Sequence, residues 1–414
     1  MAGKDIYSYY REELMRLRGS GSLRSLKTTR ERDGKYISCQ GKRLINLSSN
    51  DYLGLATDRE MVKNFYMLMD ERNLLDSFGP GSTSSRLLTG NYPLYQELED
   101  LIQGTFRSAA LQEQGGESGF DKGALIFNSG YHANTGIFQA MAGEGDLILS
   151  DSLNHASIID GIRLSRAERE TIPHLDYGYL EEVLERKRER YRNVIIATES
   201  IFSMDGDTAD LKRLVGIKNR YGAMLYVDEA HALGIYGENG LGMSEIQGTL
   251  GDTDIIVATF GKALGAHGAF ALVPGVIREF LINRMRTLIF STALPPATLA
   301  WNLFIFNKIN TLRERRLHLL ETSEKLRRSL GDAGFSIPGS GHIIPVILGE
   351  NFMALRASEM LMDQGFLIFP IRPPTVPRGT SRIRISLTSL VDWGDVENIP
   401  RILKGVNSGS GRII

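Results

Sequence analysis

The sequence predicts an α/β protein with a large domain built on a mainly parallel sheet and a smaller C-terminal α+β domain. Between residues 124 and 260, short β-rich runs bounded by glycine alternate with helical patterns, which is typical of a parallel sheet covered by helices. Beyond about residue 335 the elements change character, and Arg382-Ile-Arg-Ile-Ser-Leu387 alternates as an antiparallel strand does. We therefore expect an N-terminal arm and small segment at 1–50, a large domain at 51–295 and a C-terminal domain at 296–414.

Composition excludes several classes of protein. The chain has 414 residues, of which 42% are hydrophobic and 23% charged, an ordinary globular composition. Lys and Arg total 48 and Asp and Glu 49, so a net charge of −1 offers no electrostatic footprint for nucleic acid or an anionic membrane. The single cysteine, Cys39, excludes a disulfide framework and a multi-cysteine metal site, which fits a reducing compartment. Without a signal-like or membrane-spanning apolar run, we expect a cytoplasmic protein that binds no metal, nucleic acid or membrane.

The first part of the chain is expected to contain a docking helix and two loops. Residues 5–18 carry apolar side chains at helical spacing. The segment 79–90 is rich in glycine and hydroxyls and predicts an ordered loop of the kind that lines sites. A helix is expected from Pro93 to about Phe106, and the polar, glycine-rich residues 111–122 indicate a surface insertion without a catalytic role.

The first strand expected in the large domain leads into an anion-binding geometry. Ala124–Phe127 reads as a strand, Asn128–Tyr131 as a tight turn and Ala133–Met141 as a helix. Free N–H groups and the positive end of the helix dipole would point at whatever lies above the turn, and Gly130 would permit close backbone approach. Many α/β units have such a turn, so the motif alone is weak evidence of function.

Polar residues follow four further predicted strands. They are His155, Ser203, Asp228 with His231, and Thr259 with Lys262. Because open α/β sheets bind ligands at the carboxyl ends of their parallel strands, we expect one composite site there. Two alternatives stay open on residue types alone: His155 as a capping residue, and Lys262 and Asp228 as a surface lysine and a helix cap.

An acid and a lysine at strand ends suit pyridoxal phosphate (PLP). Lys262 would form the Schiff base, and Asp228 would keep the pyridine nitrogen protonated so that the ring acts as an electron sink. The tetrapeptide DEAH at 228–231 also occurs in helicases, which need a G-x-x-x-x-G-K-[ST] phosphate loop. That reading fails, because Ile256 stands where the first glycine is required and Ala263 follows Lys262.

The C-terminal part begins with a long helical stretch, Pro296–Asp332, expected to be interrupted once. Arg382 and Arg384 share one face of the antiparallel strand, and an arginine on a half-buried strand usually binds an anion such as a carboxylate. The tail Asn407–Ile414 is expected to be disordered.

In combination, the motifs resemble those of the α-oxoamine synthases, PLP-dependent enzymes of the aminotransferase-like fold (fold type I) that condense an amino acid with an acyl thioester and release carbon dioxide. The likeness runs from about Arg24 to Leu403. Its carriers are SSNDYLGL at 48–55, NSGYHAN at 128–134, NHASIIDG at 154–161, ESIFSMDGD at 199–207, VDEAH at 227–231, TFGKALG at 259–265, FSTALPPA at 290–297 and IRPPTVPRGTSRIRISLT at 371–388. The first and last of these motifs favour the member of the family that joins L-alanine to a pimeloyl thioester, carried on coenzyme A or a carrier protein, in biotin biosynthesis.

The resemblance implies roles for individual residues. Lys262 would hold the cofactor, Asp228 would pair with the pyridine nitrogen, and His155 would stack on the ring and assist catalysis. The further cofactor contacts implied are His231 and Ser203 at the ring-oxygen edge, Gly130, Tyr131 and Thr259 near the phosphate, and Ser291 or Thr292 reaching in from the partner of a homodimer. Arg384 would hold the amino-acid carboxylate, while Arg24 and Thr375 would face the acyl substrate.

The sequence departs from the family pattern at Ala232-Leu233, at Asn91–Tyr95 and in the insertion 112–122, which puts details of the acyl pocket in question rather than the chemistry. Two rival functions remain: a relative that uses glycine or serine, and a catalytically idle binding protein of the same fold. Intact Lys262, Asp228 and Arg384 argue against the second.

Overall fold

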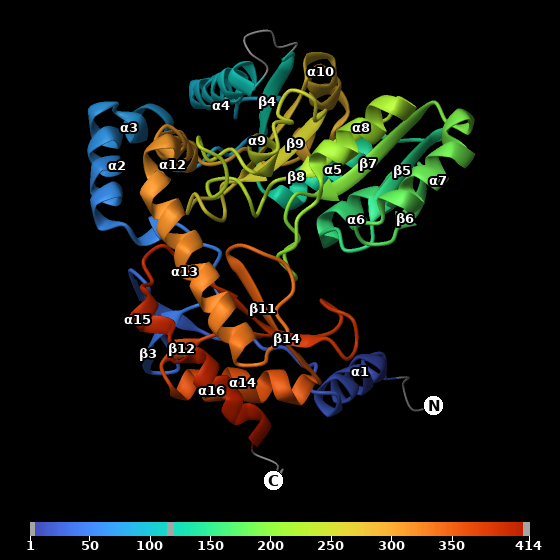
Figure 1. Cartoon of the computed structure of the whole chain (residues 1–414). Helices are drawn as coiled ribbons and strands as arrows, with labels where there is room; N and C mark the ends of the chain where they lie inside the picture. Colours follow the sequence, from blue (N-terminus) through green and yellow to red (C-terminus); the bar gives the residue numbers. More distant parts are fainter. Residues whose placement is uncertain (1–4, 114–119, 409–414) are drawn as a thin grey trace. The chain divides into compact units, whose positions relative to one another are not determined.

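The computed structural model describes residues 5–113 and 120–408 (Figure 1). Most of the predicted insertion at 112–122 and of the predicted tail at 407–414 therefore lies outside the described residues. The chain divides into two compact units. The central unit contains residues 50–203 and 207–317, and the terminal unit contains the chain before Asn50, residues 204–206 and the chain from His318 onward. The predicted domain boundary lay between residues 295 and 296, before this division.

The central unit is built on a seven-stranded sheet in the order β4-β10-β9-β8-β7-β5-β6. The strands are β4 (Lys122–Phe127), β5 (Asp146–Asp151), β6 (Glu168–Ile172), β7 (Asn193–Glu199), β8 (Met224–Asp228), β9 (Ile255–Thr259) and β10 (Ala269–Pro274). Only β10 runs antiparallel to its neighbours, β4 and β9. The predicted α/β class with a mainly parallel sheet is confirmed.

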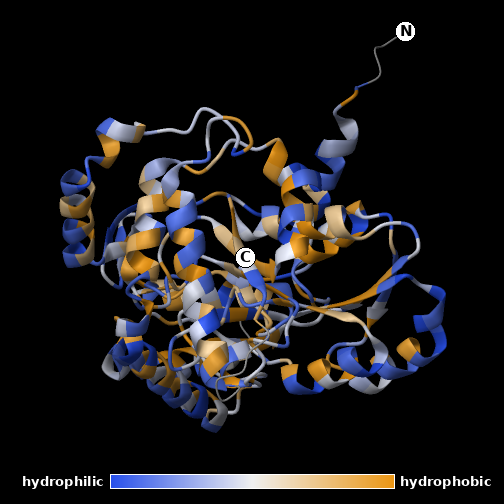
Figure 2. Cartoon of the chain, turned by 90° about the horizontal axis from the view of Figure 1, so that it is seen from above, coloured by the Kyte–Doolittle hydropathy of each residue, from blue (hydrophilic) through white to orange (hydrophobic). Residues whose placement is uncertain are grey.

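Helices cover both faces of this sheet. The helices of the unit are α2 (Arg59–Glu71), α3 (Leu74–Phe78), α4 (Pro93–Glu113), α5 (Gly130–Met141), α6 (Ala156–Leu164), α7 (Tyr177–Lys187), α8 (Leu211–Tyr221), α9 (Met243–Ile246), α10 (Gly275–Arg284), α11 (Arg286–Ile289) and α12 (Pro296–Phe306), with short 3₁₀ turns η1 (Leu55–Thr57), η2 (Arg188–Arg190) and η3 (Ile309–Leu312). One strand side chain shows the alternation: Ile148 packs with α5 and α6, whereas its neighbour Leu149 faces the side of α7 and α8. The helical ribbons in Figure 2 change between hydrophilic and hydrophobic colour within single turns, as one-sided burial requires.

Local sequence explains where the helices start. Ser129 caps α5 by accepting a hydrogen bond from the N–H of His132, and Asp210 caps α8 in the same way through Arg213. Helix α5 therefore begins at Gly130, before the predicted start at Ala133. Helix α4 continues to Glu113, past the predicted end at Phe106, so it includes the first residues of the predicted insertion.

The terminal unit combines both ends of the chain. Its first sheet has the order β1-β2-β3-β12, in which β3 pairs in parallel with β12, and its second has the order β11-β14-β13. The strands are β1 (Thr29–Asp33), β2 (Tyr36–Cys39), β3 (Lys42–Asn46), β11 (Ile343–Gly349), β12 (Phe366–Leu367), β13 (Pro370–Ile371) and β14 (Ser381–Ser386). The helices are α1 (Ser8–Gly19), α14 (Asn351–Asp363), α15 (Trp393–Val396) and α16 (Ile399–Ser408), while α13 (Arg313–Asp332) crosses the division between the units.

Cys39 is buried in the terminal unit, where it packs with Leu44 and Leu367. Helix α1, by contrast, buries none of its residues. Across residues 5–113 and 120–408, no helix combines the length and the apolar character needed to cross a membrane.

Candidate cofactor site

The sheet brings the predicted site residues of the central unit to one edge. Strands β5, β7, β8 and β9 end at Asp151, Glu199, Asp228 and Thr259, and the parallel register pairs Glu199 with Asp228. His155, Ser203, His231 and Lys262 follow within a few residues of these ends. The predicted composite arrangement at the carboxyl ends of the strands is therefore what the backbone builds.

Asp228 is buried and already oriented. Its Oδ2 accepts a hydrogen bond from Nδ2 of Asn134 at 2.7 Å, and its Oδ1 accepts one from the N–H of Ala230 at 2.9 Å. Asn134 is itself fixed, because its Oδ1 accepts a bond of 2.5 Å from the hydroxyl of Tyr226 and its Nδ2 also reaches Ser157. The carboxylate is thus held rigidly by helix α5, with geometry suited to a cationic N–H partner.

His155 begins helix α6 and faces the same region. Its Nδ1 accepts a hydrogen bond from the N–H of Ser157 at 3.2 Å, so a neutral ring carries its proton on Nε2. Desolvation by the surrounding protein lowers the pKa of His155; the charge of Asp228 opposes that shift and the charge of Lys262 adds to it. The capping role considered from sequence is therefore confirmed, and it uses Nδ1 of the ring.

Glu199 lies beside Asp228 in the sheet and is not one of the predicted site residues. It is 3% exposed, and the N–H of His155 donates to its carboxyl group. Burial first, and then the negative charge of Asp228, raise the pKa of Glu199 well above its usual value, against the lowering effect of Lys262. Its position as the last residue of a buried strand, beside Asp228, was the signal that could have identified it.

His231 is buried and held from a second motif. Its Nδ1 lies 2.8 Å from the hydroxyl of Tyr52, which donates to Oδ1 of Asn50 at 3.0 Å. The hydroxyl therefore accepts from Nδ1–H of His231, which leaves the other ring nitrogen as an acceptor in the neutral form. Asn50 and Tyr52 come from the SSNDYLGL motif, so that motif orients a residue far along the chain.

The residues expected to form an anion cradle lie at the start of α5 and the end of β9. An added Cβ at Gly130 would lie 3.9 Å from Cβ of Thr259, so the two residues face each other with little space between them. Oγ1 of Thr259 accepts a hydrogen bond from the N–H of Gly261 at 3.1 Å. Tyr131 is exposed, and its hydroxyl donates to Asp160. Free N–H groups of the first helical turn are available for a phosphate.

Ser203 and the segment at Ser291–Thr292 complete the predicted set in this unit. Ser203 is buried in the loop after β7. The carbonyl of Thr292 accepts a hydrogen bond of 2.7 Å from Nδ2 of Asn128, one residue before the cap of α5. Within its own chain, Thr292 therefore lies beside the turn that starts the anion cradle.

The remaining predicted residues belong to the terminal unit. Nη2 of Arg24 donates to Oγ1 of Thr375 at 2.7 Å, so the two predicted acyl-facing residues meet. On β14, Arg382 is buried and pairs with Asp205, whereas Arg384 is only half-buried. The two arginines that sequence placed on one face thus differ in burial.

A half-buried lysine, a rigid buried aspartate and an anion cradle at one sheet edge define a PLP-dependent enzyme of the aminotransferase-like fold. These residues fit the cofactor, because Asp228 can pair with a pyridinium and the start of α5 can receive a phosphate. Residues 42–400 match the model of the aminotransferase class I and II family, and the chain belongs to that family. The predicted resemblance, fold type and cofactor are confirmed.

Individual relatives of the chain have more specific names than the family model has. The chain is 49% identical to an 8-amino-7-oxononanoate synthase of Chlorobaculum parvum, over 97% of this chain and 100% of the relative. It is 44% identical to the 8-amino-7-oxononanoate synthase of Haemophilus ducreyi, over 92% and 96% respectively. Among solved structures, a Sphingomonas wittichii serine palmitoyltransferase has a TM-score of 0.86 at 29% identity, covering 99% of this chain and 100% of that chain. An 8-amino-7-oxononanoate synthase from Francisella tularensis has a TM-score of 0.72 at 26% identity, covering 88% and 98%.

Proposed function

We propose that this enzyme condenses L-alanine with a pimeloyl thioester to give 8-amino-7-oxononanoate, carbon dioxide and a free thiol, as a step of biotin biosynthesis. The observation that carries the proposal is the 49% identity over the full length of a relative with that name. The acyltransferase chemistry further needs a lysine, an acid at the pyridine nitrogen and a carboxylate-binding arginine, and Lys262, Asp228 and Arg384 provide them.

Each of three predicted site residues of the central unit has a role in the proposed reaction. When bound, PLP supplies an electron sink for a carbanion at the α-carbon of the amino acid. Asp228 would hold the proton on the ring nitrogen, and Lys262 would hold the cofactor and then move the α-proton. His155 would stack on the ring, and its Nε2–H would donate to the thioester carbonyl, since Nδ1 accepts from the N–H of Ser157.

The other proposed contacts follow from the positions above. His231 and Ser203 would bind the ring-oxygen edge, and Gly130, Tyr131 and Thr259 would surround the phosphate. In the terminal unit, Arg384 would bind the alanine carboxylate in a bidentate fork, while the Arg24–Thr375 pair would receive the distal carboxylate of the acyl chain.

We further propose a homodimer in which Ser291 or Thr292 completes the partner's site. Support comes from the N-terminal segment that contains α1, whose apolar residues Ile6, Tyr9 and Tyr10 are exposed in the single chain. Mixing Lys262→Ala protomers with Ser291→Ala/Thr292→Ala protomers tests this: partial recovery of activity in heterodimers supports a shared site, and no recovery in demonstrated heterodimers rejects it. A single buried cysteine fits the reducing cytoplasm, where we propose that the enzyme works.

Identification of the product decides the function. Purified enzyme with PLP is offered alanine, glycine or serine against pimeloyl and palmitoyl thioesters, and products are identified by mass spectrometry. The serine arm is required because the serine palmitoyltransferase structure superposes with the higher TM-score, 0.86 against 0.72. We expect one product, from alanine and the pimeloyl thioester. If the main product derives from serine or glycine instead, the proposal is wrong and the enzyme has the activity of the family member that uses that amino acid.

A further inference from the structure

A histidine outside the predicted site connects two of its loops. His174, in the segment between β6 and α7, is held by two aspartates: its Nδ1 lies 2.8 Å from Oδ1 of Asp151, and its Nε2 lies 2.5 Å from Oδ2 of Asp207. Because both aspartates are acceptors when ionised, both ring nitrogens must donate, which requires the imidazolium form. His174 is therefore a cation clamped between two carboxylates.

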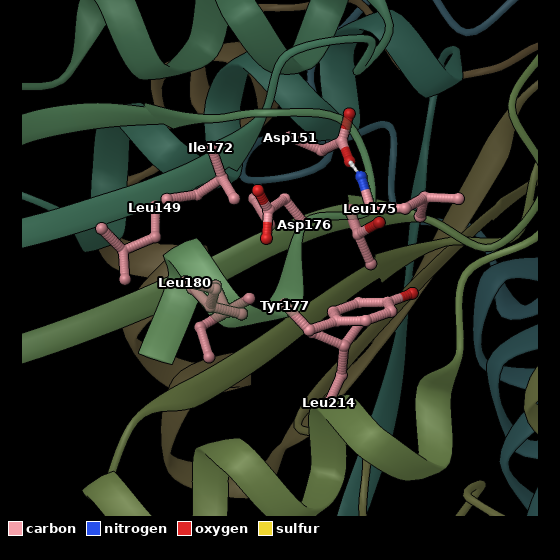
Figure 3. Close-up of a pocket in the computed structure, with 11 residues that line it drawn as sticks. Leu149, Asp151, Ile172, Leu175, Asp176, Tyr177, Leu180 and Leu214 are labelled. Carbon is pink, nitrogen blue, oxygen red and sulfur yellow. Dashed lines mark hydrogen bonds between the residues drawn. The ribbon is translucent and has the colours of Figure 1, made fainter. Parts of the chain in front are cut away.

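The first carboxylate organises the loop that carries His155. Asp151 ends β5, and its Oδ1 also accepts from the N–H of Leu153 at 2.8 Å, two residues before His155. Its Oδ2 accepts from the N–H of Leu175 at 2.9 Å, the bond that is dashed in Figure 3. The Asp151 carboxylate thus fixes both the turn that leads to His155 and the segment that presents His174.

The second aspartate, Asp207, is bonded through its main chain to the loop that carries Ser203. The carbonyl of Asp207 accepts from the N–H of Phe202 at 3.0 Å, and the ring of Phe202 packs edge-on against His174 with centroids 4.5 Å apart. Ser203 follows Phe202 directly. Through Asp207 and Phe202, His174 contacts the backbone on which Ser203 is placed.

The residues around His174 indicate that the fold imposes its position between the two aspartates. Leu175 adopts a φ of 53°, a left-handed conformation that leucine rarely takes and that the bond to Asp151 helps to hold. Beneath it lies an apolar cavity of about 20 Å³, lined by Leu149, Ile172 and Leu180 among others and large enough for about one water (Figure 3). That cavity is too small for a substrate, so the segment has no ligand of its own to explain it.

We propose that His174 is a positioning residue, a clamp between two carboxylates that holds the loops carrying His155 and Ser203 in place. This inference rests on the proposed function, since it takes both residues to contact the cofactor ring. The pKa of His174 agrees: burial alone would lower it, but the bonds and charges of Asp151 and Asp207 raise it to about 10. The clamp is therefore charged at neutral pH and needs no proton exchange during turnover.

The test compares full-length holoenzymes carrying His174→Phe, Asp207→Asn or His318→Phe. Phenylalanine keeps a ring beside Phe202 but removes both donors and the charge, and Asp207→Asn removes one side of the clamp only. His318 is a matched control, because its Nε2 also lies 3.4 Å from an aspartate, Asp392, but in the terminal unit. For each protein we measure the dissociation constant of PLP by titrating apoprotein, the pH dependence of the bound-cofactor absorbance, and kcat and KM for alanine.

For His174→Phe we expect a PLP dissociation constant raised about tenfold and a kcat lowered about tenfold, equivalent to the loss of one charge-assisted hydrogen bond. The KM for alanine should stay within about threefold, since the groups held by the clamp are proposed to contact the cofactor and not the amino-acid carboxylate. Asp207→Asn should shift in the same direction by less, and His318→Phe should match the parent.

A folded His174→Phe protein that only melts earlier, with PLP affinity, absorbance profile and kcat like the parent, would overturn the proposal. If His174→Phe does not fold, Asp207→Asn decides, because it leaves the bond between His174 and Asp151 in place: parental values there would equally overturn it. The proposed function and the role of His174 can fail independently. If the parent enzyme binds PLP but makes another product, the proposed substrate is wrong and the role of His174 is unaffected.

Discussion

The Asp228 carboxylate is fixed by Asn134 and the N–H of Ala230 without help from any ligand. Asp228→Asn keeps the shape and an acceptor for Asn134 but loses the bond from the N–H of Ala230, and an amide cannot hold the pyridinium proton by charge. We expect PLP to remain bound while turnover falls by about two orders of magnitude or more, which is within the range of a lost charge interaction. Cofactor content from absorbance and product formation from mass spectrometry are measured together; turnover within a few fold of the parent contradicts the assignment.

Glu199 and Glu229 are both buried, but the change to glutamine should affect the protein differently at the two positions. It should have little effect at Glu199 and should lower the stability at Glu229. Burial, and then the charge of Asp228, raise the pKa of Glu199 well above normal and favour the protonated acid, so Glu199→Gln should change kcat by less than about threefold. Each oxygen of Glu229 accepts a backbone N–H, from Met243 and from Ser244, so an amide NH₂ must face a donor there. Glu229→Gln should cost about 1–3 kcal/mol in the free energy of unfolding.

Denaturant unfolding and steady-state kinetics of both variants test this contrast. A loss of more than about tenfold in kcat for Glu199→Gln, with unchanged stability, would show that the reaction uses a charged carboxylate at this position.

Arg384 and Arg382 offer a similar pair. If Arg384 binds the alanine carboxylate, Arg384→Lys should raise the KM for alanine by about ten- to a hundredfold, since lysine replaces a matching fork by a point charge. Arg382 is buried against Asp205, so Arg382→Lys should lower the melting temperature and leave that KM nearly unchanged. Equal effects of the two changes on the KM for alanine would reject these separate roles.

Arg24→Ala should raise the KM of the acyl substrate instead.

At the scale of elements, helices α5 and α6 cross at a glycine. An added Cβ at Gly161 would lie 2.6 Å from the carbonyl oxygen of Asn134 and 2.9 Å from Cα of Thr135. Since both obstacles are backbone, Gly161→Ala must push the helices apart and displace the residue that orients Asp228. We expect a loss of about 2–4 kcal/mol in the free energy of unfolding together with weaker PLP binding.

The matched control is Gly216→Ala in α8, where nothing lies within 4 Å of the added carbon. There alanine should stabilise the protein, by up to about 1 kcal/mol, because it lowers the entropy of the unfolded chain. Urea unfolding of both variants, with PLP titration of each, is the measurement. A neutral Gly161→Ala would mean that the close approach of α5 and α6 is not required.

Sequence patterns predicted β4, β5, β7, β8 and β9 of the central sheet, because each is an apolar run followed by polar residues; they did not identify β6, which is mostly charged, or β10. They did not reveal that β10 enters between β4 and β9 in the opposite direction, since buried parallel and antiparallel strands have the same composition. Among site residues, lysine and aspartate at strand ends stood out, whereas Asn134 and Tyr52 did not. Their roles depend on contacts across long sequence separations, which no local pattern encodes.

At the scale of the whole molecule, the charge of His174 should make the free energy of unfolding depend on pH. Its pKa is about 6.5 when unfolded and about 10 when folded, so its contribution is complete below about pH 6.5 and is lost as the pH rises toward 10. The groups that face it are Asp151 and Asp207, with Tyr177 near Asp151; burial raises the pKa of Tyr177. The free energy of unfolding should therefore fall across this range, by at most about 1.4 kcal/mol per pH unit.

Unfolding curves at a series of pH values, for the parent and His174→Phe, isolate this effect. The difference between the two proteins should shrink steadily as the pH rises from 6.5 to 10. A difference that does not depend on pH would show that the ring contributes by packing alone.

The parallel pairing of Ile45 with Phe366, which joins β3 to β12, also has a consequence for biosynthesis. The central unit is almost continuous in sequence, so it can collapse while the ribosome is still translating. The strand at residues 42–46, although made early, must wait for its neighbour until nearly the whole polypeptide has emerged. During that interval its edge is uncovered, and this is the stage at which we expect a nascent chain to need a chaperone.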